Sequence, residues 1–207
     1  HNMAAVESLC SRSRLFDRGL LLTQGATEMV IQDYMRQGEN SEGAEVDLTR
    51  ARGRISGLRP VARRIRLLND QGQVTGNIPL GTNVSFELDI DPSERLNNVA
   101  VAFHIYNAAG QRVVTLYSRH QHQGHIVAAG LTTVTCRFLR CNLLPGPYHI
   151  VLSLLSGYQE IDRIDPVASF DVMPRDVYGT GSLPSARDGV YVANAEWSVS
   201  THAKRHP

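Results

Sequence analysis

The sequence predicts a mainly β protein, namely an antiparallel β-sandwich preceded by a short α/β extension at the N-terminus. From about residue 61, apolar and polar residues alternate with a period of two, the pattern of half-buried strands. Turn-forming residues interrupt this pattern about every 8 to 12 positions, which is typical of a sandwich. The 207 residues, 42% of them hydrophobic and 20% charged, suffice for one globular domain plus an extension.

The first 37 residues predict two short helices with a hairpin between them. Residues 2–10 place their apolar side chains on one helical face. Residues 14–24 predict a hairpin whose turn contains Gly19, because glycine readily adopts the positive φ of a tight turn. Thr27 is a suitable N-cap for a second helix, which we expect to end near Met35.

Residues 38–60 are predicted to be a linker, because they begin with a polar, acidic stretch that is poor in apolar residues. Seven arginines then occur between positions 50 and 66. They could form a basic patch facing acidic lipid or a partner subunit. They could also be a solvated linker followed by the outer face of a first strand, and the alternation Arg64-Ile65-Arg66-Leu67 favours this second interpretation.

Residues 61–200 are predicted to form the sandwich itself. The expected strands after the one around residue 65 lie near residues 84–90, 99–106, 112–117, 134–138, 148–154 and 168–172, and a last one includes Val190, Val192 and Trp197. Residues 157–166 are expected to be a loop. Tyr148 follows a corner and begins a strong strand, which is the tyrosine-corner arrangement of an immunoglobulin-like sandwich. We therefore expect Tyr148 to have a structural role.

The sequence contains no recognisable catalytic centre, so we expect no enzymatic activity and no cofactor. The only lysine is Lys204, and its neighbours do not form the phosphate-binding loop of an ATPase. The carboxylates of Glu160, Asp162 and Asp165 lie in the predicted loop, where acidic residues are common. The net charge of +1 also argues against nucleic acid as a partner.

Neither the cysteines nor the histidines predict a metal site. Three cysteines without framework spacing favour reduced thiols in a cytoplasmic protein, and no leader peptide is evident. His120, His122 and His125 have ligand-like spacing but lack a nearby carboxylate or thiolate.

Two parts of the chain resemble modules of one transporter subunit. The start of the chain is similar to the end of an ABC-transporter ATPase in the order of three segments. These are His1-Asn2-Met3, then Leu15-Phe16-Asp17-Arg18-Gly19, then Gln24 to Tyr34. In that family a switch histidine begins a helix, and a hairpin and a last helix follow. Residues 1–37 thus look like the C-terminal remnant of an ATPase domain.

Residues 55–199 resemble the C-terminal carbohydrate-binding domain of Wzt-type subunits, the ATPases of O-antigen polysaccharide exporters. The resemblance rests on the order of the two modules and on three local signatures. The signatures are residues 79–86 after Asn69-Asp70, residues 143–148, and Tyr178-Gly179-Thr180-Gly181 with 189–192 and Trp197. It implies non-catalytic recognition of the non-reducing end of the O-antigen polysaccharide, which selects the finished chain for export. It also implies a location at the cytoplasmic face of the bacterial inner membrane, a homodimer with possible exchange of C-terminal strands, and the transmembrane subunit and ATPase domain as partners.

A sugar-binding surface needs exposed aromatic rings beside hydrogen-bonding side chains on a rigid sheet. Strand alternation points His104, Tyr106 and His149 outward, and these side chains could share one face. The candidate carbohydrate-binding residues are His104, Tyr106, Tyr117, Arg119, Arg137 and His149. The guanidinium groups of Arg137 and Arg140 could bind an anionic group on the glycan.

An alternative function is a dimerisation or docking module of the export ATPase that does not touch sugar. The N-terminal remnant has no sheet of its own to pack on. We therefore expect its apolar residues, Leu15, Phe16, Val30, Ile31 and Tyr34, to be buried against the sandwich or a second protomer.

Overall fold

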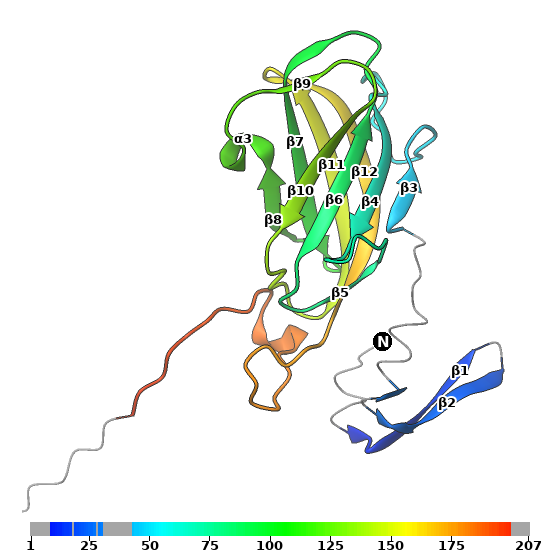
Figure 1. Ribbon diagram of the computed structural model, residues 1–207, viewed down its shortest axis with the longest axis vertical. Helices are drawn as coiled ribbons and strands as arrows, with labels where there is room; N and C mark the ends of the chain where they lie inside the picture. The colour runs from blue at the N-terminus through cyan, green and yellow to red at the C-terminus, as the bar shows by residue number, and fades with distance from the viewer. Residues whose placement is uncertain (1–8, 18, 28, 31–42, 200–207) are drawn as a thin grey trace, which may run out of the picture.

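The computed structural model describes residues 9–17, 19–27, 29–30 and 43–199. Most of them form the predicted β-sandwich (Figure 1). The first sheet has the order β10 (Thr132–Phe138), β6 (Val84–Ile90), β4 (Ala62–Leu68) and β3 (Glu45–Asp47). Every pairing in this four-stranded sheet is antiparallel.

The second sheet is larger and has six strands. Its order is β5 (Asn77–Pro79), β12 (Gln159–Met173), β11 (Gly146–Ser156), β7 (Leu96–Asn107) and β8 (Arg112–Tyr117), and β9 (Ile126–Ala128) also pairs with β7. The pairing of β5 with β12 is parallel, and the other pairings in this six-stranded sheet are antiparallel. A short helix, α3 (Ser118–Gln121), follows β8, and a 3-10 turn, η1 (Ala186–Asp188), lies near the C-terminus.

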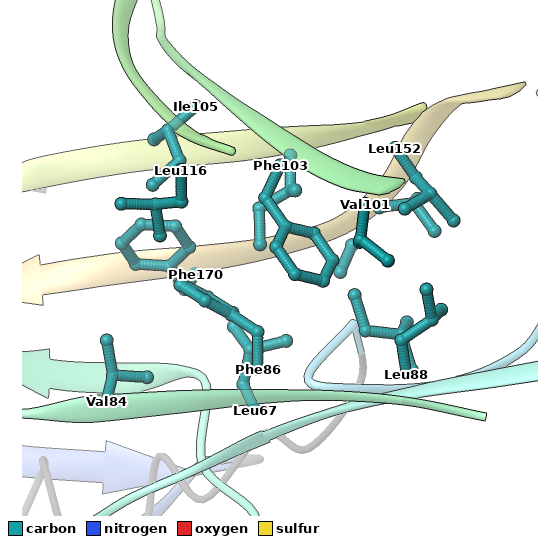
Figure 2. Close-up of a cluster of buried hydrophobic side chains, with 14 of the residues drawn as sticks. Leu67, Val84, Phe86, Leu88, Val101, Phe103, Ile105, Leu116, Leu152 and Phe170 are labelled. Atoms are coloured by element: carbon teal, nitrogen blue, oxygen red, sulfur yellow. The ribbon is translucent and has the colours of Figure 1, made fainter. Parts of the chain in front are cut away.

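The core lies between the two sheets and is built from the inward residues of each strand. The ring of Phe86 in β6 lies 5.4 Å from that of Phe103 in β7 and 6.3 Å from that of Phe170 in β12 (Figure 2). Leu67 and Leu88 beside them are also fully buried. The period of two thus predicted the core correctly, because inward residues alternate with outward polar ones.

The predicted tyrosine corner is confirmed. The hydroxyl of Tyr148 donates a hydrogen bond to the carbonyl oxygen of Leu144 at 2.7 Å. The ring is buried and stacks on Phe170 with 5.5 Å between the ring centres. Burial raises the pKa of Tyr148 to about 12, so the phenol stays protonated and remains a donor.

The linker predicted for residues 38–60 is wrong from Gly43 onward. Residues 45–47 form the edge strand β3, and the side chains of Ala44 and Leu48 are fully buried in the core. The strand has only three residues, two of which are acidic, so its composition resembles that of a linker. The sandwich therefore begins near Gly43 instead of near residue 61.

The loop predicted for residues 157–166 is also wrong, because β12 begins at Gln159. The side chain of Asp162 is fully buried in this strand. Its Oδ2 accepts hydrogen bonds from the backbone amides of Val61 and Ala62, both at 2.9 Å, and from the guanidinium of Arg54. A buried, paired carboxylate explains why this strand looks loop-like in the sequence.

The last predicted strand is only partly present. Tyr191 forms an isolated bridge with Leu143, and the backbone amide of Val192 donates to the carbonyl oxygen of Asn142 at 2.8 Å. Trp197 is 92% exposed, so including it in the sandwich was wrong for the single chain. Residues 194–199 extend away from the sheets in Figure 1.

The hairpin of the N-terminal extension is confirmed, with β1 (Arg12–Asp17) and β2 (Leu20–Ala26) antiparallel. The helices predicted for 2–10 and 27–35 lie mostly outside the described residues, as do Ile31 and Tyr34. Val30 is buried and Leu15 half-buried, but Phe16 is 57% exposed. Burial of Phe16 against the sandwich is therefore wrong, and its burial by a second protomer stays a prediction.

No helix among the described residues is long and apolar enough to span a membrane.

Candidate functional site

The outer surface of the six-stranded sheet brings together three of the predicted residues. Tyr106 in β7 lies directly opposite His149 in β11, and their rings stack at 5.2 Å with planes only 10° apart. His104 lies two residues earlier in β7, on the same side of the sheet. Phe103 and Ile105 in β7 and Ile150 in β11 are buried, so the alternation points all three rings outward.

His104 is the most constrained of these side chains. Its Nδ1 lies 3.1 Å from the hydroxyl oxygen of Thr115, which occupies the opposite position in β8. Burial lowers the pKa of His104 below 6.5, and the nearby charges of Arg112 and Arg163 lower it further, while Glu160 acts in the opposite direction. The ring is therefore neutral at pH 7, so that one nitrogen can donate and the other can accept a hydrogen bond.

A second row of residues crosses the same sheet nearer the start of β7. Tyr117, Ala102, Ser153 and Arg163 occupy successive paired positions in β8, β7, β11 and β12. Arg163 donates to the hydroxyl of Ser153 at 3.2 Å and to the carboxylate of Glu160 at 3.4 Å. We call these two rows, with Thr115 and Arg112, the outer face of the six-stranded sheet.

The structure places Tyr117 on this outer face but puts Arg119 beyond its end. The ring of Tyr117 is nearly perpendicular to the ring of His120 in α3, with 4.8 Å between the ring centres. Arg119, also in α3, donates to the carbonyl oxygen of Gly157 and lies 4.9 Å from the centre of the Tyr158 ring. Arg119 thus borders a pocket at the end of the sheet instead of the stacked rings.

Arg137 does not join the other predicted residues. It lies on β10 of the four-stranded sheet, and its guanidinium pairs with the carboxylate of Asp70 at 2.7 Å. The sequence could show that Arg137 points outward but could not show which sheet β10 enters. Including it in one site with His104 was therefore wrong.

The arginines of β4 also face outward on the four-stranded sheet, as the strand interpretation predicted. Arg64 pairs with Asp89 at 2.9 Å, and Arg66 pairs with Glu87 at 3.0 Å. Burial raises the pKa of Asp89, but hydrogen bonds from Thr133 and Arg64 outweigh it, so the net shift is downward. These arginines therefore serve carboxylates within their own sheet.

Thr115, Arg112 and Arg163 are among the members of the outer face that the sequence did not reveal. Thr115 could have been found, because it alternates with Tyr117 in β8. Arg112 pairs with Tyr106 after a register shift between Ile105 and Tyr106, and this shift breaks the simple alternation. Arg163 was hidden in the segment that we expected to be a loop.

The described residues contain no group of three or more histidine, cysteine or acidic side chains that could hold a metal ion. The three histidines with ligand-like spacing have different surroundings. His120 packs on Tyr117, the Nδ1 of His125 lies 3.2 Å from the side-chain oxygen of Asn98, and His122 lines the pocket beside Arg119.

The fold defines the protein as an immunoglobulin-like β-sandwich with a polar and aromatic outer face. A family model described as the Wzt C-terminal domain matches residues 62–183, which is more than half of the chain. The chain therefore belongs to the family of Wzt C-terminal domains. This membership supports a role in polysaccharide export by an ABC transporter.

One solved structure agrees with this assignment at the level of the fold. The crystal structure of the C-terminal domain of wzt matches with a TM-score of 0.55 and 13% identity, covering 79% of this chain and 92% of that one. A putative β-galactosidase from Bacteroides fragilis matches with a TM-score of only 0.36 and 16% identity, over 54% of this chain and 16% of that one. No curated protein matches the chain.

Proposed function

We propose that this domain binds the non-reducing end of an O-antigen polysaccharide on the outer face of the six-stranded sheet, without catalysing a reaction. Binding there selects the finished glycan for export. The observation that carries the proposal is the stacked pair of Tyr106 and His149 with His104 beside it. Membership in the Wzt C-terminal domain family supports it.

The chemistry of this face suits a sugar. A pyranose ring has a patch of C–H groups that packs on aromatic rings, and its hydroxyls both donate and accept hydrogen bonds. A neutral His104 can do both, whereas Arg112 and Arg163 offer only donors. Because the side chains stand on paired strands, little conformational entropy is lost when the ligand binds.

The proposal places the domain at the cytoplasmic face of the bacterial inner membrane. There it acts beside the ATPase domain and the transmembrane subunit, as part of a homodimer. The glycan is held as substrate of the transporter, and no cofactor takes part.

Titration calorimetry and NMR with the native polysaccharide test the proposal. The variant Tyr106→Ala/His149→Ala should bind about tenfold or more weakly, because it removes both rings of the stack. Thr135→Ala is the matched control, since Thr135 is an exposed outward residue of β10 on the other sheet, and it should bind as the unchanged protein does. A folded protein that does not bind the full-length glycan, or a double variant with unchanged affinity, would contradict the proposal.

The exposed C-terminal segment favours a second function, docking or dimerisation without glycan contact. Trp197 and Val199 are 92% and 94% exposed, which is unusual for large apolar side chains unless a partner covers them. Sedimentation of the full chain and of a chain ending at Ala193 tests this function. A dimer that requires the segment, in a protein that binds no glycan, would favour docking.

A further inference from the structure

We infer a second ligand subsite, which rests on the proposed function: a pocket at the end of the six-stranded sheet that holds an anionic sugar residue of the glycan. The pocket has a volume of about 260 Å³. Three segments line it: the start of β7, residues 118–126 around α3, and the turn between β11 and β12. Figure 1 shows α3 beside β7, with β9 at the same end of the sandwich.

Hydrogen bonds around Gly157 hold the pocket together. The backbone amide of Gly157 donates to the carbonyl oxygen of Asn98 at 3.1 Å, and its own carbonyl oxygen accepts from Arg119. Asn98 has a φ of 58°, a left-handed conformation that asparagine tolerates better than most residues. These bonds link the hairpin turn to both β7 and α3, so the pocket is formed before any ligand arrives.

The lining chemistry favours an anion. Arg119, His122 and His125 border the pocket, and none of the residues lining it is an aspartate or glutamate. A guanidinium has five N–H donors in a planar array, which matches carboxylate and phosphate oxygens. The bond to Gly157 and the contact with Tyr158 leave donors of Arg119 for such an oxygen.

Tyr158 makes the pocket suitable for a sugar as well as for an ion. Its side chain is 94% exposed at the tip of the hairpin, and Arg119 lies over the ring at 4.9 Å. An exposed aromatic side chain beside a basic pocket provides a surface for the C–H patch of a pyranose. The combination matches a uronic acid or a sugar phosphate, which share a negative charge next to a sugar ring.

The pocket lies at the start of β7, the strand that also carries Tyr106 of the outer face. Val99, which lines it, and Tyr106 belong to the same strand, and seven residues of strand span roughly 23 Å. Tyr117 lies between them, opposite Ala102 and in contact with His120. An extended oligosaccharide can therefore lie across the outer face and end in the pocket, whereas a monosaccharide can occupy only one of the two.

The test is NMR titration of the isotope-labelled protein with glucuronic acid, glucose 6-phosphate and neutral glucose. We expect either acidic probe to shift the amide signals of Arg119, Gly124 and Tyr158, with glucose binding at least about tenfold more weakly. The stronger of the two acidic probes identifies the anion as carboxylate or phosphate. Binding should also weaken between 0.05 and 0.5 M NaCl, because the groups are near the surface.

Variants separate this subsite from the outer face. Arg119→Gln and His122→Gln should each weaken binding of the acidic probe, and His122, which is exposed, can be replaced with little risk to the fold. His149→Ala is the control, because it alters the outer face and should leave the pocket unchanged. Equal binding of glucose and the acidic probes, or acid binding that both pocket variants retain, would overturn the inference. Native glycan that binds only through the outer face would also overturn it, while the proposed function would stand.

Discussion

At the scale of single residues, the charge of the His104 ring depends on its neighbours in the outer face. Its ring is in reach of two guanidinium groups and is half-buried, and both effects lower its pKa. A neutral imidazole can accept a hydrogen bond from a sugar hydroxyl, which an imidazolium cannot do. The two arginines therefore favour the neutral form of His104, the form that the proposed glycan binding requires.

This gives a prediction about pH. Arg112→Gln should raise the pKa of His104, as measured by NMR titration of the ring, because one neighbouring positive charge is removed. Arg137→Gln, on the other sheet, should leave the titration unchanged. An unaltered His104 titration in Arg112→Gln would show that the charge of Arg112 does not contribute to the lowered pKa.

The same shift predicts how stability depends on pH. The folded pKa of His104 is lowered, so between that pKa and 6.5 the unfolded chain binds more protons than the folded chain. His104 therefore makes its full contribution to the free energy of unfolding above pH 6.5. This contribution declines as the pH falls from 6.5 toward the lowered pKa. Urea unfolding at a series of pH values, compared with His104→Gln, measures the contribution.

The residues of the outer face also show what the sequence can and cannot predict. Alternation predicted the directions of His104, Tyr106 and His149, because period two determines which side of a strand a residue occupies. It could not predict the position of Arg112, which depends on a bulge. It also could not assign Arg137 to a sheet, because pairing between distant strands is set by the whole chain.

At the scale of elements, the contact between β12 and the segment before β4 closes the sandwich. Arg54 reaches Asp162 and donates to the carbonyl oxygens of Leu48 and Ala62 at 2.8 and 2.9 Å. Gly53 lies against the backbone of Asp165 so closely that a Cβ would be 2.2 Å from its carbonyl oxygen. The chain after β3 is therefore tightly fixed to the start of β12.

Removing the charge of Arg54 should be costly. Arg54→Met leaves the carboxylate of Asp162 buried without its cation, and we expect the free energy of unfolding to fall by about 3 to 5 kcal/mol. Arg63→Met is the matched control, since Arg63 pairs with Asp91 at 3.7 Å near the surface and should cost about 1 kcal/mol or less. Urea denaturation measures the free energy of unfolding of both variants. Equal losses would show that the buried ion pair stabilises the fold no more than the exposed one does.

Elements were predicted well where burial and alternation agree, as in β6, β7 and β11. They were missed where a strand is short or rich in charged residues, as in β3 and the first part of β12. Val46 is the only apolar residue of β3, and Asp162 takes an inner position of β12 because Arg54 pairs with it. Such partnerships between distant residues cannot be inferred from local composition.

At the scale of the whole molecule, the sandwich is a self-contained unit. Its core cluster runs from Ala44 to Val192 and does not include the β1–β2 hairpin. A chain of residues 43–193 should therefore unfold cooperatively, with a Tm within about 4 °C of that of the full chain. Calorimetry measures this, and a much lower Tm would mean that the extension supports the sandwich.

Particular contacts also define the C-terminal boundary of the sandwich. Val192 is buried, and the hydroxyl of Tyr178 donates to the carbonyl oxygen of Ala193 at 2.7 Å. A chain that ends at Asp188 loses both contacts and should be clearly less stable than the chain ending at Ala193. Equal Tm values for these two chains would show that the segment after η1 is dispensable.

The division between inward and outward residues has a consequence for how such a domain can change over generations. The phenylalanine cluster and the strand ladders maintain the fold, and neither depends on which side chains occupy the outer positions near His104 and Tyr106. Mutations can therefore replace the outer residues while the domain still folds. Related domains can thus carry different outer faces on one inherited framework.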